Sequence, residues 1–206
     1  MSSSSININT LRAALKDAQN LSPTSDFDLN ADNWPKGASL RSAAVLVPVI
    51  ERDAQLNVVL TKRAATLRNH PGQIAFPGGK IDAGDVNPQA AALREAHEEI
   101  GLNHRHVDVL GELPNHETVT GFDVHLFVAQ IDPNFAPNPD KNEVDEVFEV
   151  PLSHVLKPDN FLIEGRVWQD QMRHYYVVPY GPYYIWGATA RMLRMLAHRV
   201  ELINAN

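Results

Sequence analysis

The chain of 206 residues contains no cysteine. Disulfide bonds, cysteine nucleophiles and thiolate metal sites are therefore excluded. No apolar run reaches the ~18 residues that a membrane-spanning helix needs. The first residues, Met1 to Ser5, offer neither the basic region nor the apolar stretch of a secretory signal. We therefore expect a cytoplasmic protein that does not enter a membrane.

Positive charge is also scarce, because 18 Lys and Arg residues stand against 25 Asp and Glu residues, for a net charge of -7. This balance argues against nucleic acid as the main partner. A polyanionic small-molecule substrate would need bound metal and a few well-placed cations to supply local positive charge. The hydrophobic content of 44% is sufficient for one good core without a second domain.

Acidic side chains, by contrast, are concentrated in one short segment. Glu95, Glu98 and Glu99 stand at positions i, i+3 and i+4, which places them on one face of a helix within a single turn. Like charges at this spacing repel, so a cation is expected over them. Carboxylate oxygens are hard ligands, which suit Mg²⁺ or Mn²⁺. We therefore predict that this glutamate cluster binds one of these metals.

The helix that carries the cluster has clear ends. Asn87 is a favourable N-cap, Pro88 suits the first helical position, and Gly101 suits the residue after the last turn. A glycine-rich loop leads into the helix. Gly78 and Gly79 in this loop would let the backbone approach a phosphate or a metal closely, because glycine has no side chain.

The stretch from Gly79 to Leu102 resembles the Nudix box, whose usual form is G-x5-E-x7-R-E-U-x-E-E-x-G-U, where U is a bulky apolar residue. The matching residues are Gly79, Arg94, Glu95, Glu98, Glu99, Gly101 and Leu102. Three departures are visible. Asp85 stands at the first glutamate position, eight residues rather than seven separate it from Arg94, and Ala96 is smaller than the expected apolar residue.

The segment before the box explains the first two departures, because it resembles the signature of the coenzyme A pyrophosphatase branch of the Nudix family. That branch carries aspartate at this point and has the longer spacing. The matching residues are Leu60 to Arg63, Leu67, Arg68, His70, Gly72 to Gly79, Asp82 and Asp85. The combined match therefore extends from Leu60 to Leu102.

The resemblance implies a fold and a reaction. The fold would be the α/β Nudix sandwich, α/β/α, around a mixed β-sheet. The reaction would be metal-dependent hydrolysis of the diphosphate bond of coenzyme A or its thioesters, giving 3′,5′-ADP and (acyl) 4′-phosphopantetheine. Glu95 and Glu98 would be catalytic as well as metal-binding, with one glutamate of the cluster handling the proton of water. Arg94 would orient a glutamate, and an i,i+4 ion pair between Arg94 and Glu98 could exist beside that role.

Outside the box, the predicted substrate-binding residues are Lys62, Arg63, Arg68, Gly78 and Gly79. The three cations are candidates for binding the substrate phosphates, including the 3′-phosphate of coenzyme A. Surface salt bridges are the competing interpretation for each cation. Glu143 and Glu146 resemble a late acidic segment that supplies a further metal or water contact in Nudix enzymes, although an acidic loop of this kind is often only solvated.

A group of aromatic residues near the C-terminal end could form the wall of a base or pantetheine pocket, and core packing explains it equally well. The group consists of Tyr175, Tyr176, Tyr180, Tyr183, Tyr184 and Trp186. Two other functions stay open at this point. One is hydrolysis of another nucleoside diphosphate derivative such as ADP-ribose or a dinucleotide. The other is a non-catalytic module that senses a nucleotide. The sequence does not decide between a monomer and a homodimer.

The remaining pattern predicts alternating helices and strands. We divide the chain into an N-terminal arm, residues 1–40, and a Nudix hydrolase domain, residues 41–206. The arm would be disordered to about residue 8 and carry a short helix from Leu11 to Ala18, capped by Asn9 or Thr10. Predicted strands are 42–50, 56–62, 107–113, 124–131 and 147–152. Residues 167–178 would form a strand or hairpin arm, and residues 185–203 a closing helix.

Overall fold

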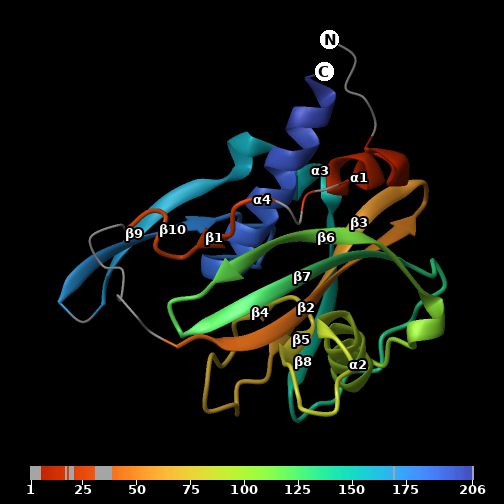
Figure 1. The fold of residues 1–206 in the computed structure, drawn as a ribbon, viewed down its shortest axis with the longest axis horizontal. Helices are drawn as coiled ribbons and strands as arrows, with labels where there is room; N and C mark the ends of the chain where they lie inside the picture. Colours follow the sequence, from red (N-terminus) through yellow and green to blue (C-terminus); the bar gives the residue numbers. More distant parts are fainter. Residues whose placement is uncertain (1–5, 17, 19–20, 31–38, 169, 206) are drawn as a thin grey trace.

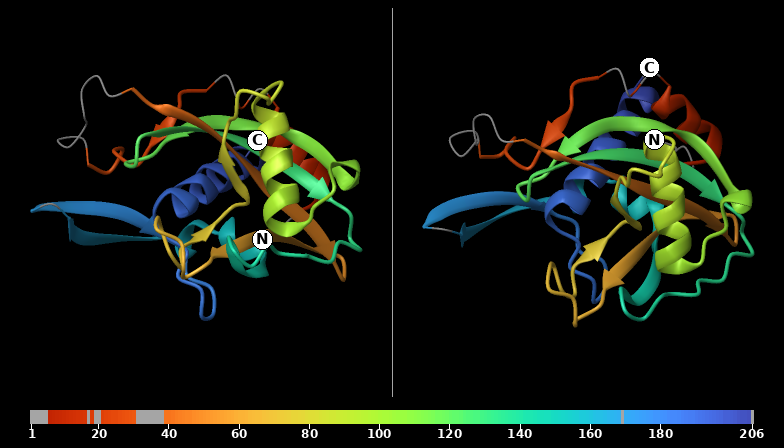
Figure 2. Two further views of the ribbon diagram at one scale, coloured as in Figure 1. Left: turned by 90° about the horizontal axis from the view of Figure 1, so that it is seen from below. Right: turned by 60° about the horizontal axis from the view of Figure 1, so that its bottom comes forward.

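A mixed β-sheet lies between helices in the computed structural model, which describes residues 6–16, 18, 21–30, 39–168 and 170–205. Helix α2 (Pro88–Ile100) covers one face of the sheet, while α1 (Ile8–Leu15) and α4 (Gly187–Asn204) lie on the other (Figures 1 and 2). The predicted α/β/α sandwich around a mixed sheet is therefore confirmed.

The main sheet contains eight strands, ordered β1-β6-β7-β2-β3-β4, with β5 added to β2 and β8 added to β3. The strands are β1 (Thr24–Ser25), β2 (Arg41–Arg52), β3 (Gln55–Arg63), β4 (Ile74–Ala75), β5 (Gly78–Lys80), β6 (Val107–Glu117), β7 (Phe122–Ile131) and β8 (Val144–Pro151). The β2–β7 and β1–β6 pairs are parallel, and the other pairs are antiparallel.

The remaining elements are α3 (Leu152–Val155), the 3₁₀ turns η3 (His104–His106) and η4 (Pro158–Asn160), and a separate hairpin. The hairpin consists of β9 (Leu162–Trp168) and β10 (Gln171–Val177), and it extends away from the sandwich (Figure 1).

On one of its two sides, strand β2 pairs first with β5 and then with β3, and Pro48 lies between these two pairings. Residues 43–45 pair with β5, whereas residues 49–52 pair with β3. A proline in a central strand would ordinarily remove a ladder hydrogen bond. Pro48 avoids this cost because it lies between the two pairings. The sheet is therefore split at this edge, and the chain between β3 and β5 forms the loop beside the glutamate cluster.

The sheet separates two hydrophobic clusters. The larger lies on the side of α1 and α4 and includes Leu11, Leu126 and Leu193. The smaller lies under α2, where Ala92 and Ala96 are fully buried. Small alanine side chains let a helix pack closely on a sheet. Ala96, which departs from the bulky residue of the Nudix box, belongs to this close contact.

The N-terminal helix and the hairpin are among the predicted elements whose ends differ from the structure. The N-terminal helix begins at Ile8 and ends at Leu15, because Asn7 accepts a hydrogen bond from the Thr10 N–H and so caps it. The caps predicted at Asn9 or Thr10 were therefore wrong. The hairpin begins at Leu162, so the prediction for residues 167–178 missed most of β9.

The predicted disorder falls largely on residues 1–5, which lie outside the described residues. The described part of the arm packs against the domain, since α1 contacts α4 and β6 and contributes to the larger cluster. The boundary between residues 40 and 41 stays a prediction. Within the described ranges, no helix combines the length and apolar character needed to cross a membrane.

Replacing Gly78 by alanine is expected to destabilise the fold. A Cβ atom there would lie 2.5 Å from the Ala44 carbonyl oxygen and 2.7 Å from the Val45 Cα, and the φ angle is +156°. Overpacking and a disfavoured backbone conformation each cost about 1–3 kcal/mol. Urea unfolding should therefore show a loss of about 2 kcal/mol or more.

The control for this substitution is Gly84→Ala. A Cβ at Gly84 would meet no atom within 4 Å. Its unfolding free energy should stay within about 0.5 kcal/mol of the parent value. Equal stability of the two variants would contradict the close approach of β5 to β2.

Candidate active site

Helix α2 has the ends that the sequence predicts. The Asn87 side chain accepts a hydrogen bond of 2.8 Å from the Ala90 N–H, and Pro88 begins the helix. Gly101 adopts the left-handed conformation at φ +73°, and its N–H bonds to the His97 carbonyl. These ends fix where the helix starts and stops, and so which residues face the glycine-rich loop.

Glu99 is the most buried member of the glutamate cluster. Its side chain is only 4% exposed and accepts a hydrogen bond of 3.1 Å from the Gly78 N–H. The Arg63 guanidinium lies 3.9 Å from its other oxygen. Burial raises the pKa of Glu99 to about 8, despite the Gly78 N–H and Arg63. The site therefore holds a carboxylate whose ionised form lacks sufficient compensating positive charge.

Glu95 lies directly against the loop at Gly79. A Cβ atom at residue 79 would be 2.4 Å from the carboxylate carbon of Glu95. Only glycine leaves the space that this carboxylate occupies, so the Gly79 match to the box has a steric reason. Burial raises the pKa of Glu95, while Arg94 acts in the opposite direction.

Arg94 connects the helix to the loop through several carboxylates. It donates two hydrogen bonds to Asp85, at 3.0 and 2.9 Å, and one Nη1 contacts both Glu95 and Glu98 at 3.0 Å. It also donates to the Lys80 carbonyl. The hydrogen bond from Arg94 lowers the pKa of Asp85. The i,i+4 pair with Glu98 is therefore present, as one part of a larger network.

Asp85 was matched to the family signature, but its partner could not be foreseen from spacing alone. In the structure, the Asp85–Arg94 pair closes the loop back onto the helix nine residues later. Glu98 is 56% exposed and is bound by Arg94. Glu95 and Glu99 thus lie on the side of helix α2 that faces the loop, whereas Glu98 faces solvent.

The three predicted cations occupy different surroundings. Arg63 is part-buried beside Glu99, and among the described residues its Nε is buried without a hydrogen-bond partner. A buried unpaired donor is rare in native structures. Lys62 and Arg68 are exposed. Among the residues that the structure describes, no hydrogen bond or ion pair joins either of them to the glutamate cluster.

The two acidic residues of the later segment, Glu143 and Glu146, also have different surroundings. The charge of Glu143 contributes to the raised pKa values of Glu95 and Glu99, so this side chain lies on the cluster's side. Glu146 instead accepts a hydrogen bond of 2.6 Å from the Tyr183 hydroxyl. Glu143 is therefore the better placed of the two for a contact near the glutamates.

The aromatic residues divide between packing contacts and the wall of a cavity. Tyr183 stacks on Phe148 at a centroid distance of 3.6 Å, which is packing. Tyr175, Tyr176 and Trp186 line a cavity on the α4 side of the sheet. Arg166, which also lines this cavity, lies in the part of β9 that was not predicted from the sequence.

A divalent cation fits the donors at the glutamate cluster. Among the described residues, no three acidic or histidine side chains already converge on one point. Magnesium often takes only one or two protein carboxylates and completes its shell with water and substrate phosphates. Glu99, buried with insufficient positive charge, and Glu95, one turn away, match that requirement.

Comparisons with known proteins agree with this geometry. The NUDIX domain model matches residues 40–171. Curated relatives include an "Uncharacterized Nudix hydrolase NudL" of Enterobacter sp. (strain 638), 42% identical over 79% of this chain and 84% of its own. The NudL of Cronobacter sakazakii is 44% identical over 78% of this chain and 83% of its own.

Some solved structures are similar to the chain at lower identity. A C. elegans Ap4A hydrolase binary complex is 20% identical, with a TM-score of 0.48, and covers 57% of this chain and 85% of that chain. The NUDIX domain of Shewanella oneidensis NrtR complexed with ADP ribose is 22% identical, with a TM-score of 0.45, and covers 62% and 84%. The domain match and the curated relatives carry the assignment: the chain belongs to the Nudix family, and it is a hydrolase of a nucleoside diphosphate derivative.

Proposed function

We propose that the protein hydrolyses the diphosphate bond of coenzyme A or its thioesters, giving 3′,5′-ADP and (acyl) 4′-phosphopantetheine. The observation that carries this proposal is the continuous signature from Leu60 to Leu102. Its two ends meet in space, because Arg63 at one end lies beside Glu99 at the other. The loop between them supplies the Gly78 N–H to Glu99.

Each side chain has a proposed task. Glu95, Glu98 and Glu99 hold Mg²⁺ or Mn²⁺, and a bound divalent ion neutralises phosphate charge and lowers the pKa of water. Arg94 keeps the Glu95 and Glu98 carboxylates in place, and Glu98 or Glu95 accepts the proton of the attacking water. Glu98 is suited to proton release because it is open to solvent.

The cations and the loop would receive the diphosphate. The Arg63 guanidinium, which is part-exposed beside Glu99, can donate to a phosphate oxygen. Gly78 and Gly79 leave room for the diphosphate beside the helix. Lys62 and Arg68, both exposed, would add longer-range attraction for an anionic substrate.

The second candidate is hydrolysis of another nucleoside diphosphate derivative, such as ADP-ribose or a dinucleotide. The glutamate cluster and Arg94 would serve that reaction equally well, since they act on the diphosphate alone. A nucleotide sensor without activity is a weaker alternative, because a binding module has no need for all four residues.

A substrate panel tests the proposal. The parent enzyme is assayed with coenzyme A, acetyl-coenzyme A, dephospho-coenzyme A, ADP-ribose and a diadenosine polyphosphate, each with Mg²⁺ and with Mn²⁺. We expect the highest kcat/KM with coenzyme A or its thioester, and mass spectrometry should identify 3′,5′-ADP as a product. Faster cleavage of ADP-ribose would favour the second candidate, and the absence of any metal-dependent product would favour the sensor.

A further inference from the structure

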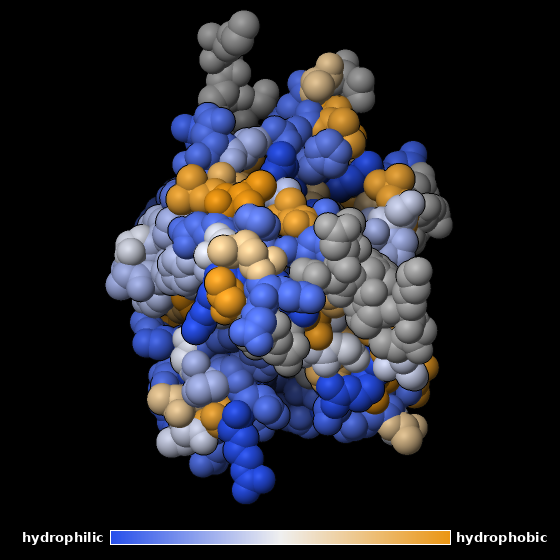
Figure 3. All heavy atoms as spheres, turned by 90° about the vertical axis from the view of Figure 1, so that its left-hand side faces the viewer, coloured by the Kyte–Doolittle hydropathy of each residue, from blue (hydrophilic) through white to orange (hydrophobic). Residues whose placement is uncertain are grey.

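A cavity of about 380 Å³ lies on the α4 side of the sheet, away from the face that α2 covers. Its walls come from the segment Ser25–Asn30, the turn at Val119 and Thr120, the β9–β10 hairpin and the start of α4. Cavities of a few hundred Å³ are the size that small-molecule ligands use. Figure 3 shows this side of the molecule, where apolar side chains form separate patches among polar ones.

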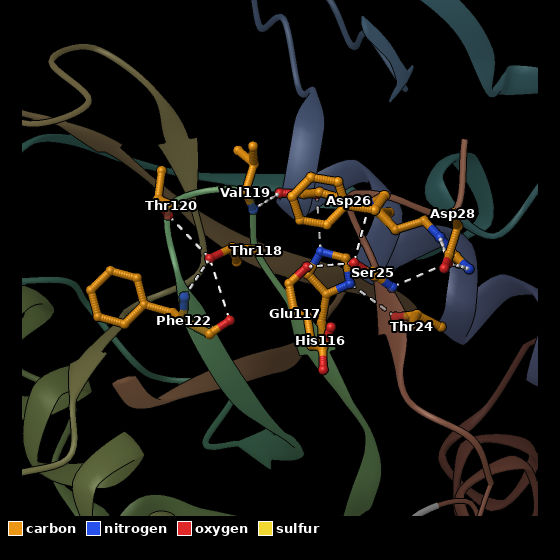
Figure 4. Close-up of polar contacts among 12 residues, drawn as sticks. Thr24, Ser25, Asp26, Asp28, His116, Glu117, Thr118, Val119, Thr120 and Phe122 are labelled. Atoms are coloured by element: carbon orange, nitrogen blue, oxygen red, sulfur yellow. Dashed lines mark hydrogen bonds and ion pairs between the residues drawn. The ribbon is translucent and has the colours of Figure 1, made fainter. Parts of the chain in front are cut away.

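Hydrogen bonds hold in place the N-terminal segment that forms part of the cavity wall. The ring of His116, which is fully buried, lies between Thr24 and Asp26, with contacts of 2.9 and 3.1 Å (Figure 4). The second carboxylate oxygen of Asp26 accepts a hydrogen bond of 2.9 Å from the Val119 N–H. The segment is therefore anchored to β6, and the oxygens of Asp26 are already engaged.

The lining is positively charged, although the whole chain carries a net charge of -7. Among the described residues, Arg166, Arg173 and Arg191 line the cavity, and Asp26 is its acidic residue. Asp28, outside the lining, pairs with Arg191 at 2.7 Å. With both aspartates counted, these described residues carry three positive charges against two negative ones. A local excess of this sign favours an anionic ligand.

Two of these arginines face each other across the hairpin. Arg173 is the direct cross-strand partner of Arg166 in the antiparallel register. Directly opposite side chains project from the same face of a sheet, and like charges in this position destabilise the pair. A phosphate beside both guanidinium groups can accept charge-assisted hydrogen bonds from each of them.

Aromatic rings complete the cavity. Tyr175 and Trp186 meet edge to face with centroids 5.2 Å apart. Tyr176 lies under the Arg191 guanidinium at 5.7 Å. Such rings provide flat apolar surface against which a planar heterocycle can stack. Arginines beside aromatic rings are therefore a combination that suits a phosphorylated nucleoside.

One loop borders both the cavity and the glutamate cluster. His70 and Gln73 line the cavity. The Gln73 carbonyl accepts a hydrogen bond of 2.9 Å from the Arg63 N–H, and the Arg63 side chain reaches Glu99. This loop therefore connects the wall of the cavity with the residues around the glutamate cluster.

We propose that this cavity binds the nucleotide half of the substrate, and that Arg166 and Arg173 bind a phosphomonoester separate from the diphosphate under attack. In coenzyme A that group is the 3′-phosphate, so this inference rests on the proposed function. It assigns recognition of the 3′-phosphate to the hairpin, and leaves Arg63 to the diphosphate beside Glu99.

The test measures binding, without turnover. Adenosine 3′,5′-bisphosphate and AMP are titrated into the metal-free protein by calorimetry. The parent should bind the bisphosphate roughly 10- to 100-fold more tightly than AMP, because the extra phosphate gains charged hydrogen bonds. Arg166→Ala should remove most of this difference and change AMP affinity by less than about threefold.

Two further variants make the result specific. Arg173→Ala should behave like Arg166→Ala. Because Arg166 is exposed, Arg166→Ala is expected to fold, and it tests the inference even if Arg173→Ala folds poorly. Arg105→Ala removes an exposed arginine on η3, outside the cavity, and should retain the parent ratio. A parent that binds both nucleotides equally, or a ratio unchanged in Arg166→Ala, would overturn the inference.

Kinetics separate this inference from the function that it extends. If the parent cleaves coenzyme A and the preference over dephospho-coenzyme A survives in Arg166→Ala, the hairpin assignment is wrong and the proposed function stands. If the parent cleaves neither compound, the proposed function is wrong. The bisphosphate titration then shows by itself whether the cavity binds a nucleotide with an additional phosphate.

Discussion

Replacing Glu99 by glutamine is expected to lower kcat/KM by at least ~10²-fold while the protein still folds. Glutamine keeps the size of the side chain and an oxygen that can accept from the Gly78 N–H. It removes the charge that would bind the metal. Steady-state rates at saturating Mg²⁺ and Mn²⁺ measure the effect.

The thermal midpoint of unfolding provides an independent test of the same substitution. The Glu99 carboxylate is buried with Arg63 as a cation at 3.9 Å, so removing its charge should leave the thermal midpoint of the metal-free protein unchanged or higher. Added metal should raise the midpoint of the parent, because a ligand that binds only the folded state stabilises it. This increase should be reduced in Glu99→Gln.

The matched control is Glu51→Gln, which removes an exposed carboxylate near the end of β2. It should retain both the parent rate and the parent response to metal. Near-normal activity of Glu99→Gln would show that Glu99 is not a metal ligand.

Features that depend on neighbouring residues could be predicted from the sequence. The ends of α2 follow from Asn87, Pro88 and Gly101, each of which acts within one helical turn. The shared face of Glu95 and Glu99 follows from helical geometry. These features need no knowledge of how the chain folds back on itself.

Features that depend on distant contacts could not be predicted in the same way. The Asp85–Arg94 pair requires the course of the loop, which the pairing of β5 with β2 determines. Arg63 reaches Glu99 at a point where the β3–β8 register shifts between Lys62 and Arg63, an irregularity that alternation alone does not reveal.

The β9–β10 hairpin was predicted only in part, as a strand or hairpin arm over residues 167–178, without most of β9. Its strands contain exposed apolar residues, including Ile163 and Val167, so they lack the regular inward and outward alternation of a half-buried strand. The connection between them also lacks the Asn-Gly or Asp-Gly pair that marks a tight hairpin turn. The cavity arginines therefore went unnoticed, since only the paired strands bring Arg166 opposite Arg173.

Replacing Gly79 by alanine is expected to lower kcat/KM by about 10²-fold with little change in stability, because a displacement of about 1 Å in a catalytic group can cost that much. The new Cβ would lie 2.4 Å from the Glu95 carboxylate carbon, so this carboxylate must move. The colliding atoms are the far end of a flexible side chain, and the backbone around them can stay in place. The unfolding free energy should therefore change by less than about 1 kcal/mol.

A double-mutant cycle shows whether the loss in kcat/KM is caused by displacement of the Glu95 carboxylate. If Gly79→Ala acts by displacing this carboxylate, then it should cost little more in a Glu95→Ala background, and the two effects will not add. Gly84→Ala, where a Cβ meets nothing within 4 Å, controls for stiffening of the loop and should keep the parent rate. Additive losses in kcat/KM would mean that the methyl group obstructs the diphosphate directly, and that the space at Gly79 serves the substrate rather than Glu95.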